Sequence, residues 1–221
     1  DDVYISFFVV SSSQNGVLAD LSEIRIDRTP PEVTVPAYPD GAPLPSPQDE
    51  RALNPVWGWY PGLRPTSEYF LNAGAFTLVG APYTDLTHGT ITSPWVELPV
   101  SGNFTSQVHV RFTPVQRWQV SGYMFYGNND LSTRVDFRRI GDGGGDQTID
   151  VSAVDNNSTR SLTRIPWAAT DYYLRVQRKR QILEFSYSED GQHWETLLPS
   201  YVTTLPPEIK LTPVNDNYMY L

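Results

Sequence analysis

The chain has 221 residues, a formal net charge of −9 and no cysteine. The acidic balance argues against nucleic acids and anionic membranes as partners, because phosphate groups are held by clustered Lys and Arg side chains. The absence of cysteine excludes a disulfide framework and a thiolate metal site, and no apolar run approaches the roughly 20 residues that cross a bilayer. Neutral ligands such as sugars are compatible with this composition.

The composition predicts strands and turns. The chain contains 13 Tyr and 6 Trp, which favour strands, and 19 Pro and 15 Gly, which leave few windows for a helix. A chain of this length can bury one large β-sandwich or two small domains. We therefore expect an all-β protein.

The first part of the chain divides into two segments. Residues 3–10 and 17–26 are strand-like and are separated by a polar turn, which predicts a β-hairpin. Pro30-Pro31 and the alternating Pro43, Pro45 and Pro47 follow, and this density of proline prevents regular ladders and favours an extended linker. We predict an N-terminal hairpin over residues 1–27, a linker over 28–54 and a sandwich over 55–221.

The third segment reads as a series of short strands without a helical period. Alternation is clearest where Val108, Val110 and Phe112 share one face and His109 and Arg111 share the other. The pattern predicts a sandwich or jelly roll with one wet face. The predicted strands cover residues 75–79, 91–98, 105–112, 120–126, 132–140, 148–154, 172–178 and 182–188.

Three short motifs in the last third of the chain form a known combination. Residues 172–178 carry "LRV.R", residues 183–188 carry "F.YS", and Asp190-Gly191 with Trp194 give "DG..W". Over roughly residues 55–200 the chain resembles the concanavalin A-like modules at the C-terminus of family 43 glycoside hydrolases, and a related enolase-regulator-like domain of unknown function. The resemblance implies a jelly-roll β-sandwich, a fold that hosts enzymes, lectins and inert spacers.

The resemblance fails at the ends of the chain. The family's closing hairpin is missing after residue 200, while residues 5–13 and 19–26 have the character of such a hairpin. Three explanations stay open. The hairpin could be the tail of a preceding similar domain, could close its own sandwich in a permuted order, or could be donated to another copy and build a filament.

Catalytic and metal motifs are weak. Retaining glycosidases place two carboxyl groups about 5 Å apart, and the sequence has no strand with carboxylates in that arrangement, so we expect no enzyme. His88, His109 and His193 lack metal-ligand spacing. Oxygen ligands for calcium could come from the glycine-rich stretch and its flank, at Asp142, Asp146 and Asp150, although the stretch could equally be a hairpin tip.

Sugar recognition combines aromatic faces with planar polar side chains, and such residues fall in neighbouring predicted strands. The candidate ligand-binding residues are Trp118, Tyr123, Tyr126, Arg134, Asp136 and Arg138. Two competing interpretations apply. Large aromatics in a sandwich belong more often to the core, where we place Trp57, Trp59 and Trp194, and Asp136 between two arginines could be a solvated ion pair.

We expect a non-catalytic, extracellular module that binds carbohydrate or supports a glycan-active protein. Three Asn-x-Ser/Thr patterns, at Asn103, Asn156 and Asn157, agree weakly with an extracellular site. The alternative is a structural subunit of a filament or surface array, assembled from copies that exchange the N-terminal hairpin. A glycoside hydrolase is the third choice.

Overall fold

A computed structural model describes residues 7–10, 17–28, 58–60, 68–72, 75–80, 93, 95–114, 119–127, 130–141, 147–156, 158–205 and 208–212. The predicted linker over 28–54 lies almost entirely outside these residues. Every regular element among them is a β-strand, and none of them forms a helix that could cross a membrane. The composition therefore predicted the class of secondary structure correctly.

The strands form two antiparallel sheets. The first sheet begins with β3 (Gly58–Tyr60) and β6 (Trp95–Ser101). Next to β6 lie β1 (Phe7–Val10) and β15 (Glu208–Thr212), which both pair with β6 on one side and with β8 (Gln119–Gly127) on the other. The sheet continues from β8 through β9 (Asp130–Gly141) and β10 (Thr148–Asp155) to β11 (Ser158–Pro166). The second sheet contains β14 (Glu195–Val202), β13 (Ile182–Ser188), β12 (Asp171–Lys179), β7 (Phe104–Phe112), β2 (Val17–Arg28), β5 (Ala75–Gly80) and β4 (Glu68–Asn72).

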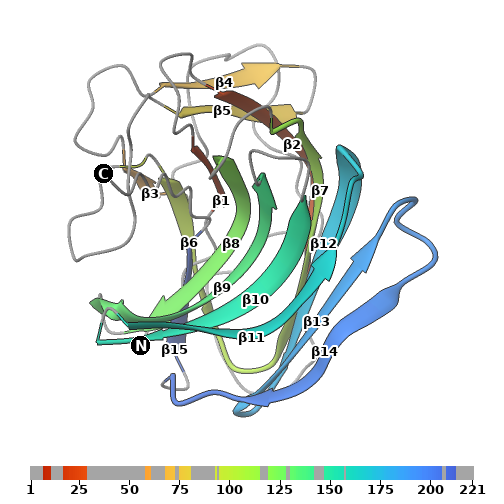
Figure 1. The fold of residues 1–221 in the computed structure, drawn as a ribbon. Helices are drawn as coiled ribbons and strands as arrows, with labels where there is room; N and C mark the ends of the chain where they lie inside the picture. The colour runs from red at the N-terminus through yellow and green to blue at the C-terminus, as the bar shows by residue number, and fades with distance from the viewer. Residues whose placement is uncertain are drawn as a thin grey trace.

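The two sheets pack face to face, and strands β8, β9 and β10 bend so that the first sheet is concave on the side away from the second sheet (Figure 1). The core fills the space between the sheets. Phe185 of β13 packs edge-on against Phe125 of β8 and Phe137 of β9, with ring centroids 5.9 and 5.3 Å apart. The predicted concanavalin-like sandwich is confirmed.

Strand β9 shows how the sequence pattern sets the two faces of the first sheet. Val135 and Phe137 point into the core, whereas Arg134, Asp136 and Arg138 alternate with them and lie on the concave face. All nine residues of the neighbouring strand β8 are buried, so this part of the sheet is covered on both sides. The concave face is thus both polar and buried.

The two N-terminal strands lie in different sheets. β1 pairs with β6 and β8 of the first sheet, and β2 pairs with β5 and β7 of the second. The ladders of the described residues contain no β1–β2 pairing. Residues 11–16, which join the two strands, lie outside the described residues, so the N-terminal hairpin stays a prediction.

Candidate functional site

A row of alternating charges crosses the concave face of the first sheet. Nε of Arg134 donates to Oδ1 of Asp136 at 3.1 Å, and Nη1 of Arg138 lies 3.7 Å from Oδ2 of Asp136. Arg138 then reaches across to Asp150 on β10, its register partner. We call Arg134, Asp136, Arg138, Asp150 and Arg164 the charged row.

Asp150 accepts hydrogen bonds from three side chains. Arg138 binds it with two parallel hydrogen bonds, from Nε to Oδ1 at 3.0 Å and from Nη2 to Oδ2 at 3.2 Å. The Ser152 hydroxyl and Nη2 of Arg164 also donate to Oδ2, at 2.9 and 3.2 Å. Burial alone would raise the pKa of Asp150, but Arg138, Ser152 and Arg164 together hold it below its ordinary value.

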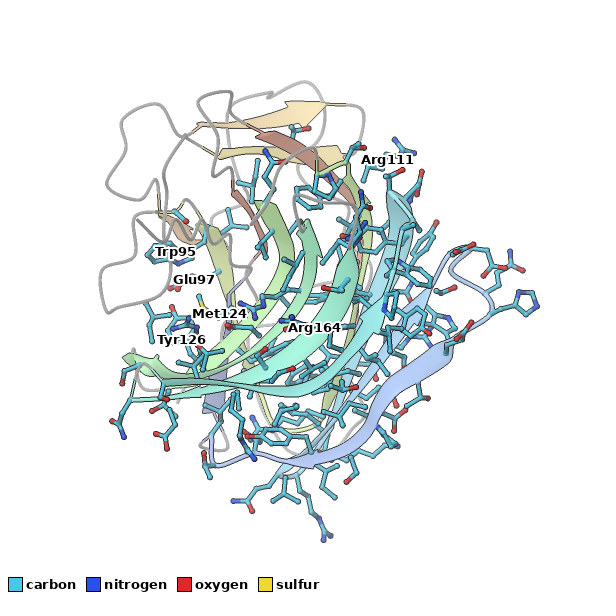
Figure 2. All side chains as sticks on the ribbon, viewed as in Figure 1. Trp95, Glu97, Arg111, Met124, Tyr126 and Arg164 are labelled. Carbon is cyan, nitrogen blue, oxygen red and sulfur yellow. The ribbon has the colours of Figure 1, made fainter. Side chains whose placement is uncertain are left out.

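Aromatic side chains stand at the β6–β8 end of the row. Tyr126 lies opposite Arg134 in the β8–β9 ladder, and its hydroxyl donates to Oε2 of Glu97 on β6. Nε1 of Trp95 donates to the same oxygen at 3.4 Å. Figure 2 shows Trp95, Glu97 and Tyr126 gathered on one side of the molecule, with Arg164 further across the sheet.

The row changes from buried to exposed along its length. The side chains of Asp136 and Asp150 are 1% and 0% exposed, that of Arg138 is 10% exposed, and that of Arg164 is 44% exposed. Arg164 is therefore the point where the row reaches water. Among the described residues, no side chain or backbone group donates a hydrogen bond to the buried Oδ2 of Asp136, and Nη1 of Arg138 lies 3.7 Å from it.

Stability alone gives a poor account of these residues. Several charged groups on a buried face cost desolvation energy that ion pairs repay only in part, and apolar side chains of similar size often stabilise such positions as well or better. A row of planar donors and acceptors, in contrast, suits the recognition of a polar ligand.

The structure brings four of the six predicted ligand-binding residues together on the concave face, namely Tyr126, Arg134, Asp136 and Arg138. Tyr123 lies on the opposite face of β8, with no exposed surface, and its hydroxyl is 3.2 Å from Oγ of Ser106 in the second sheet. Burial raises the pKa of Tyr123. Tyr123 is a core residue: it lies three positions before Tyr126, and residues an odd number apart in a strand point to opposite faces. Trp118 lies outside the described residues.

Of the three predicted calcium ligands, the structure describes only Asp150. Its carboxylate accepts hydrogen bonds from two arginines and a serine. Asp142 and Asp146 lie outside the described residues. Among the residues that the structure does describe, no group of three potential metal ligands occurs.

Four residues of this site were not predicted from the sequence: Trp95, Glu97, Ser152 and Arg164. Asp150 and Ser152 alternate in the same way as Arg134, Asp136 and Arg138, so the spacing offered a usable signal. The sequence offered no such signal for Arg164. Its strand β11 is mostly exposed, so no apolar alternation marked it as a strand.

The outer face of the second sheet explains the "DG..W" motif in structural terms. Nε1 of Trp194 donates to the carbonyl of Gly191 at 3.1 Å, and the guanidinium of Arg175 lies 3.5 Å from the centre of the Trp194 ring. Tyr173 is stacked on His109 at 4.3 Å. We predicted Trp194 as a core residue, but it packs with Arg175 on the outside of the sheet.

Comparison with known proteins agrees with this architecture. The family model of the β-xylosidase C-terminal concanavalin A-like domain matches residues 49–210, which begin after β2. A crystal structure of a functionally unknown protein from Saccharomyces cerevisiae is 18% identical, covers 75% of this chain and 98% of its own, and has a TM-score of 0.51. A GH43_12 protein from a capybara gut metagenome is 13% identical, with 62% of this chain and 30% of its own chain covered, at a TM-score of 0.47.

No curated protein sequence matches the chain. The likeness to the yeast structure supports the fold alone, since its identity is low. The family model spans well over half of the residues and includes β3 to β14 and most of β15. The chain therefore belongs to the family of β-xylosidase C-terminal concanavalin A-like domains.

Proposed function

We propose that the chain is a non-catalytic, extracellular module that binds a neutral glycan on the concave face of its first sheet. The observation that carries the proposal is the charged row, which joins an aromatic end at Trp95 and Tyr126 to a water-accessible end at Arg164. The module family takes its name from β-xylosidases, so xylo-oligosaccharides are the first ligands to test.

The chemistry of the row suits sugar hydroxyls. Each hydroxyl donates one hydrogen bond and accepts others, and the row presents guanidinium donors beside carboxylate acceptors. Among the described residues Oδ2 of Asp136 accepts no hydrogen bond, and the rings of Trp95 and Tyr126, which are 9% and 3% exposed, place an apolar surface beside the row. Neutral ligands also agree with the net charge of −9.

The state of the carboxylates favours binding over hydrolysis. A glycosidase needs one carboxylic acid with a raised pKa to protonate the leaving group. The pKa of Asp150 is instead held below its ordinary value by Arg138, Ser152 and Arg164, against the effect of burial. Asp150 therefore stays a hydrogen-bond acceptor, which is the role that a binding site requires.

The test uses the exposed end of the row, where a substitution disturbs the fold least. Arg164→Ala should weaken binding to a xylo-oligosaccharide at least tenfold in isothermal calorimetry. The matched control is Arg160→Ala on the same strand β11, because Arg160 is exposed and lies opposite Ala153, outside the row. The control should bind as the parent chain does.

A second variant probes the aromatic end. Tyr126→Phe removes only the hydroxyl that donates to Glu97 and should also weaken binding, without loss of the sandwich by circular dichroism. The proposal is contradicted if the chain binds no xylo-oligosaccharide and no other polysaccharide on a glycan array. Parental affinity in both Arg164→Ala and Tyr126→Phe would also contradict it.

A further inference from the structure

One strand position in the first sheet is filled by two segments from distant parts of the chain. Between β6 and β8, Lys210, Leu211 and Thr212 of β15 pair with residues 126, 125 and 124 of β8. Phe7 of β1 pairs with Tyr123, the next residue along β8, and Val10 pairs with Val120. β1 thus continues the ladder at the position where β15 ends, in the same direction.

The second N-terminal strand occupies an equally central position. β2 lies between β7 and β5, with register pairs that include Asp27 with Thr105 and Leu21 with Phe76. Without β2, the pair β4–β5 would lose its only ladder to the remainder of the second sheet among the described strands. β1 and β2, which we call the arm, therefore complete both sheets.

All ladder partners of the arm belong to β5, β6, β7 and β8. The arm makes no ladder within itself, so it is bound to the rest of the sandwich much as a peptide is bound by strand addition. The same hydrogen bonds and side-chain contacts would form if the arm came from another copy of the chain.

The chain between the arm and β3 is long enough for such an exchange. Residues 29–57 separate β2 from β3, and 29 extended residues span up to about 100 Å. The prolines in this stretch favour extended conformations over compact ones. Exchange of an identical element between copies costs little when both states contain the same contacts.

We propose that the arm of one copy fills the β6–β8 and β5–β7 positions of a second copy, so that the chain assembles by strand exchange. The exchange occurs at high protein concentration, where the second copy competes with the chain's own arm. An open series of such exchanges gives a filament, and a reciprocal exchange gives a dimer.

The full-length, cysteine-free chain allows a clean crosslinking test. One variant carries Asp27→Cys on the arm and the other carries Thr105→Cys on β7, its register partner. The two chains bear tags of different length, are refolded together, and are oxidised. A mixed disulfide-linked dimer should form, and its share should rise with protein concentration.

The matched control uses the other neighbour of Thr105. Gln177 of β12 is its register partner on the opposite side, and its Nε2 lies 3.4 Å from Oγ1 of Thr105. Chains with Gln177→Cys and Thr105→Cys should give no mixed dimer, because β7 and β12 both belong to the part that does not exchange. The proposal is overturned if the Asp27→Cys and Thr105→Cys chains also give none, while a single chain with both cysteines forms its internal disulfide.

Discussion

Two aspartates, one on each sheet, illustrate how differently the two outer faces of the sandwich are built. Asp150 on the concave face and Asp171 on the outer face of the second sheet each hold two basic side chains. Asp150 binds Arg138 and Arg164, and Asp171 binds His109 and Nε of Arg111, the latter at 3.3 Å. The side chain of Asp150 has no exposed surface, whereas that of Asp171 is 56% exposed.

This difference in exposure indicates which of the two faces is the better candidate for a ligand site. At Asp171 the carboxylate and Arg111 remain in water, although the side chain of His109 is only 7% exposed, so the contacts of this carboxylate contribute little. At Asp150 the charges are removed from water, and the fold must compensate each one with a partner. A cluster that is costly to bury is a better candidate for a ligand site than one that is not.

The largest effect that tests this comparison comes from removing each carboxylate. Asp150→Ala leaves Arg138 without its two parallel hydrogen bonds in a buried place, and we expect the free energy of unfolding to fall by about 3–5 kcal/mol. Asp171→Ala should lower it by about 1 kcal/mol or less. Urea denaturation at neutral pH measures both values, and equal losses would contradict the distinction between the faces.

Stability at acid pH tests the same difference between Asp150 and Asp171. The pKa of Asp150 is lower in the folded chain than the ordinary value of about 3.9, so the unfolded chain binds more protons near that pH. The stabilisation is present above the unfolded pKa and is lost as the pH falls through the folded pKa. Asp150→Asn should therefore flatten the decline of the free energy of unfolding below about pH 5.

The pKa of Asp171 is also lowered: burial raises it, but His109 and Arg111 lower it by more. Because this carboxylate is half-exposed, we expect Asp171→Asn to flatten the acid decline less than Asp150→Asn does. Urea midpoints at a series of pH values measure both slopes. A steeper change from Asp171→Asn would show that exposure is the wrong basis for ranking the two aspartates.

Much of the fold could be predicted from the sequence, because apolar alternation and turn chemistry are local. Strands β7, β8, β9 and β10 were predicted within a few residues of their observed bounds. β11 was missed because its residues lie mostly exposed, so that no apolar alternation marks it. The ladder partners of β1 and β2 could not be predicted, since they depend on which distant strands offer an open position.

The site was only partly predictable for a related reason. The spacing of Arg134, Asp136 and Arg138 places them on one face of a strand, but which face meets the core depends on the whole sheet. Tyr123 and Tyr126 were both predicted as ligand-binding residues. They are three apart in one strand and therefore lie on opposite faces. Glu97 joins Tyr126 through the pairing of β6, β15 and β8, which no local pattern encodes.

The smallest predicted effect concerns the outer face, where close packing replaces charge burial. Gly191 has a φ of +73°, and a Cβ added there would lie 3.0 Å from Cζ of Tyr173. Gly102 has a φ of +71° but open space around the same position, which makes it the matched control. Gly102→Ala should cost about 1–2 kcal/mol from backbone strain alone.

Gly191→Ala should cost about 1 kcal/mol more than Gly102→Ala, because Tyr173 cannot retreat easily. Its ring is stacked on His109 at 4.3 Å and meets the edge of Trp194, which Arg175 covers on one face. Thermal unfolding of both variants measures the difference. Equal destabilisation would mean that the "DG..W" turn needs glycine only for its backbone conformation, and that the aromatic packing on this face adapts freely.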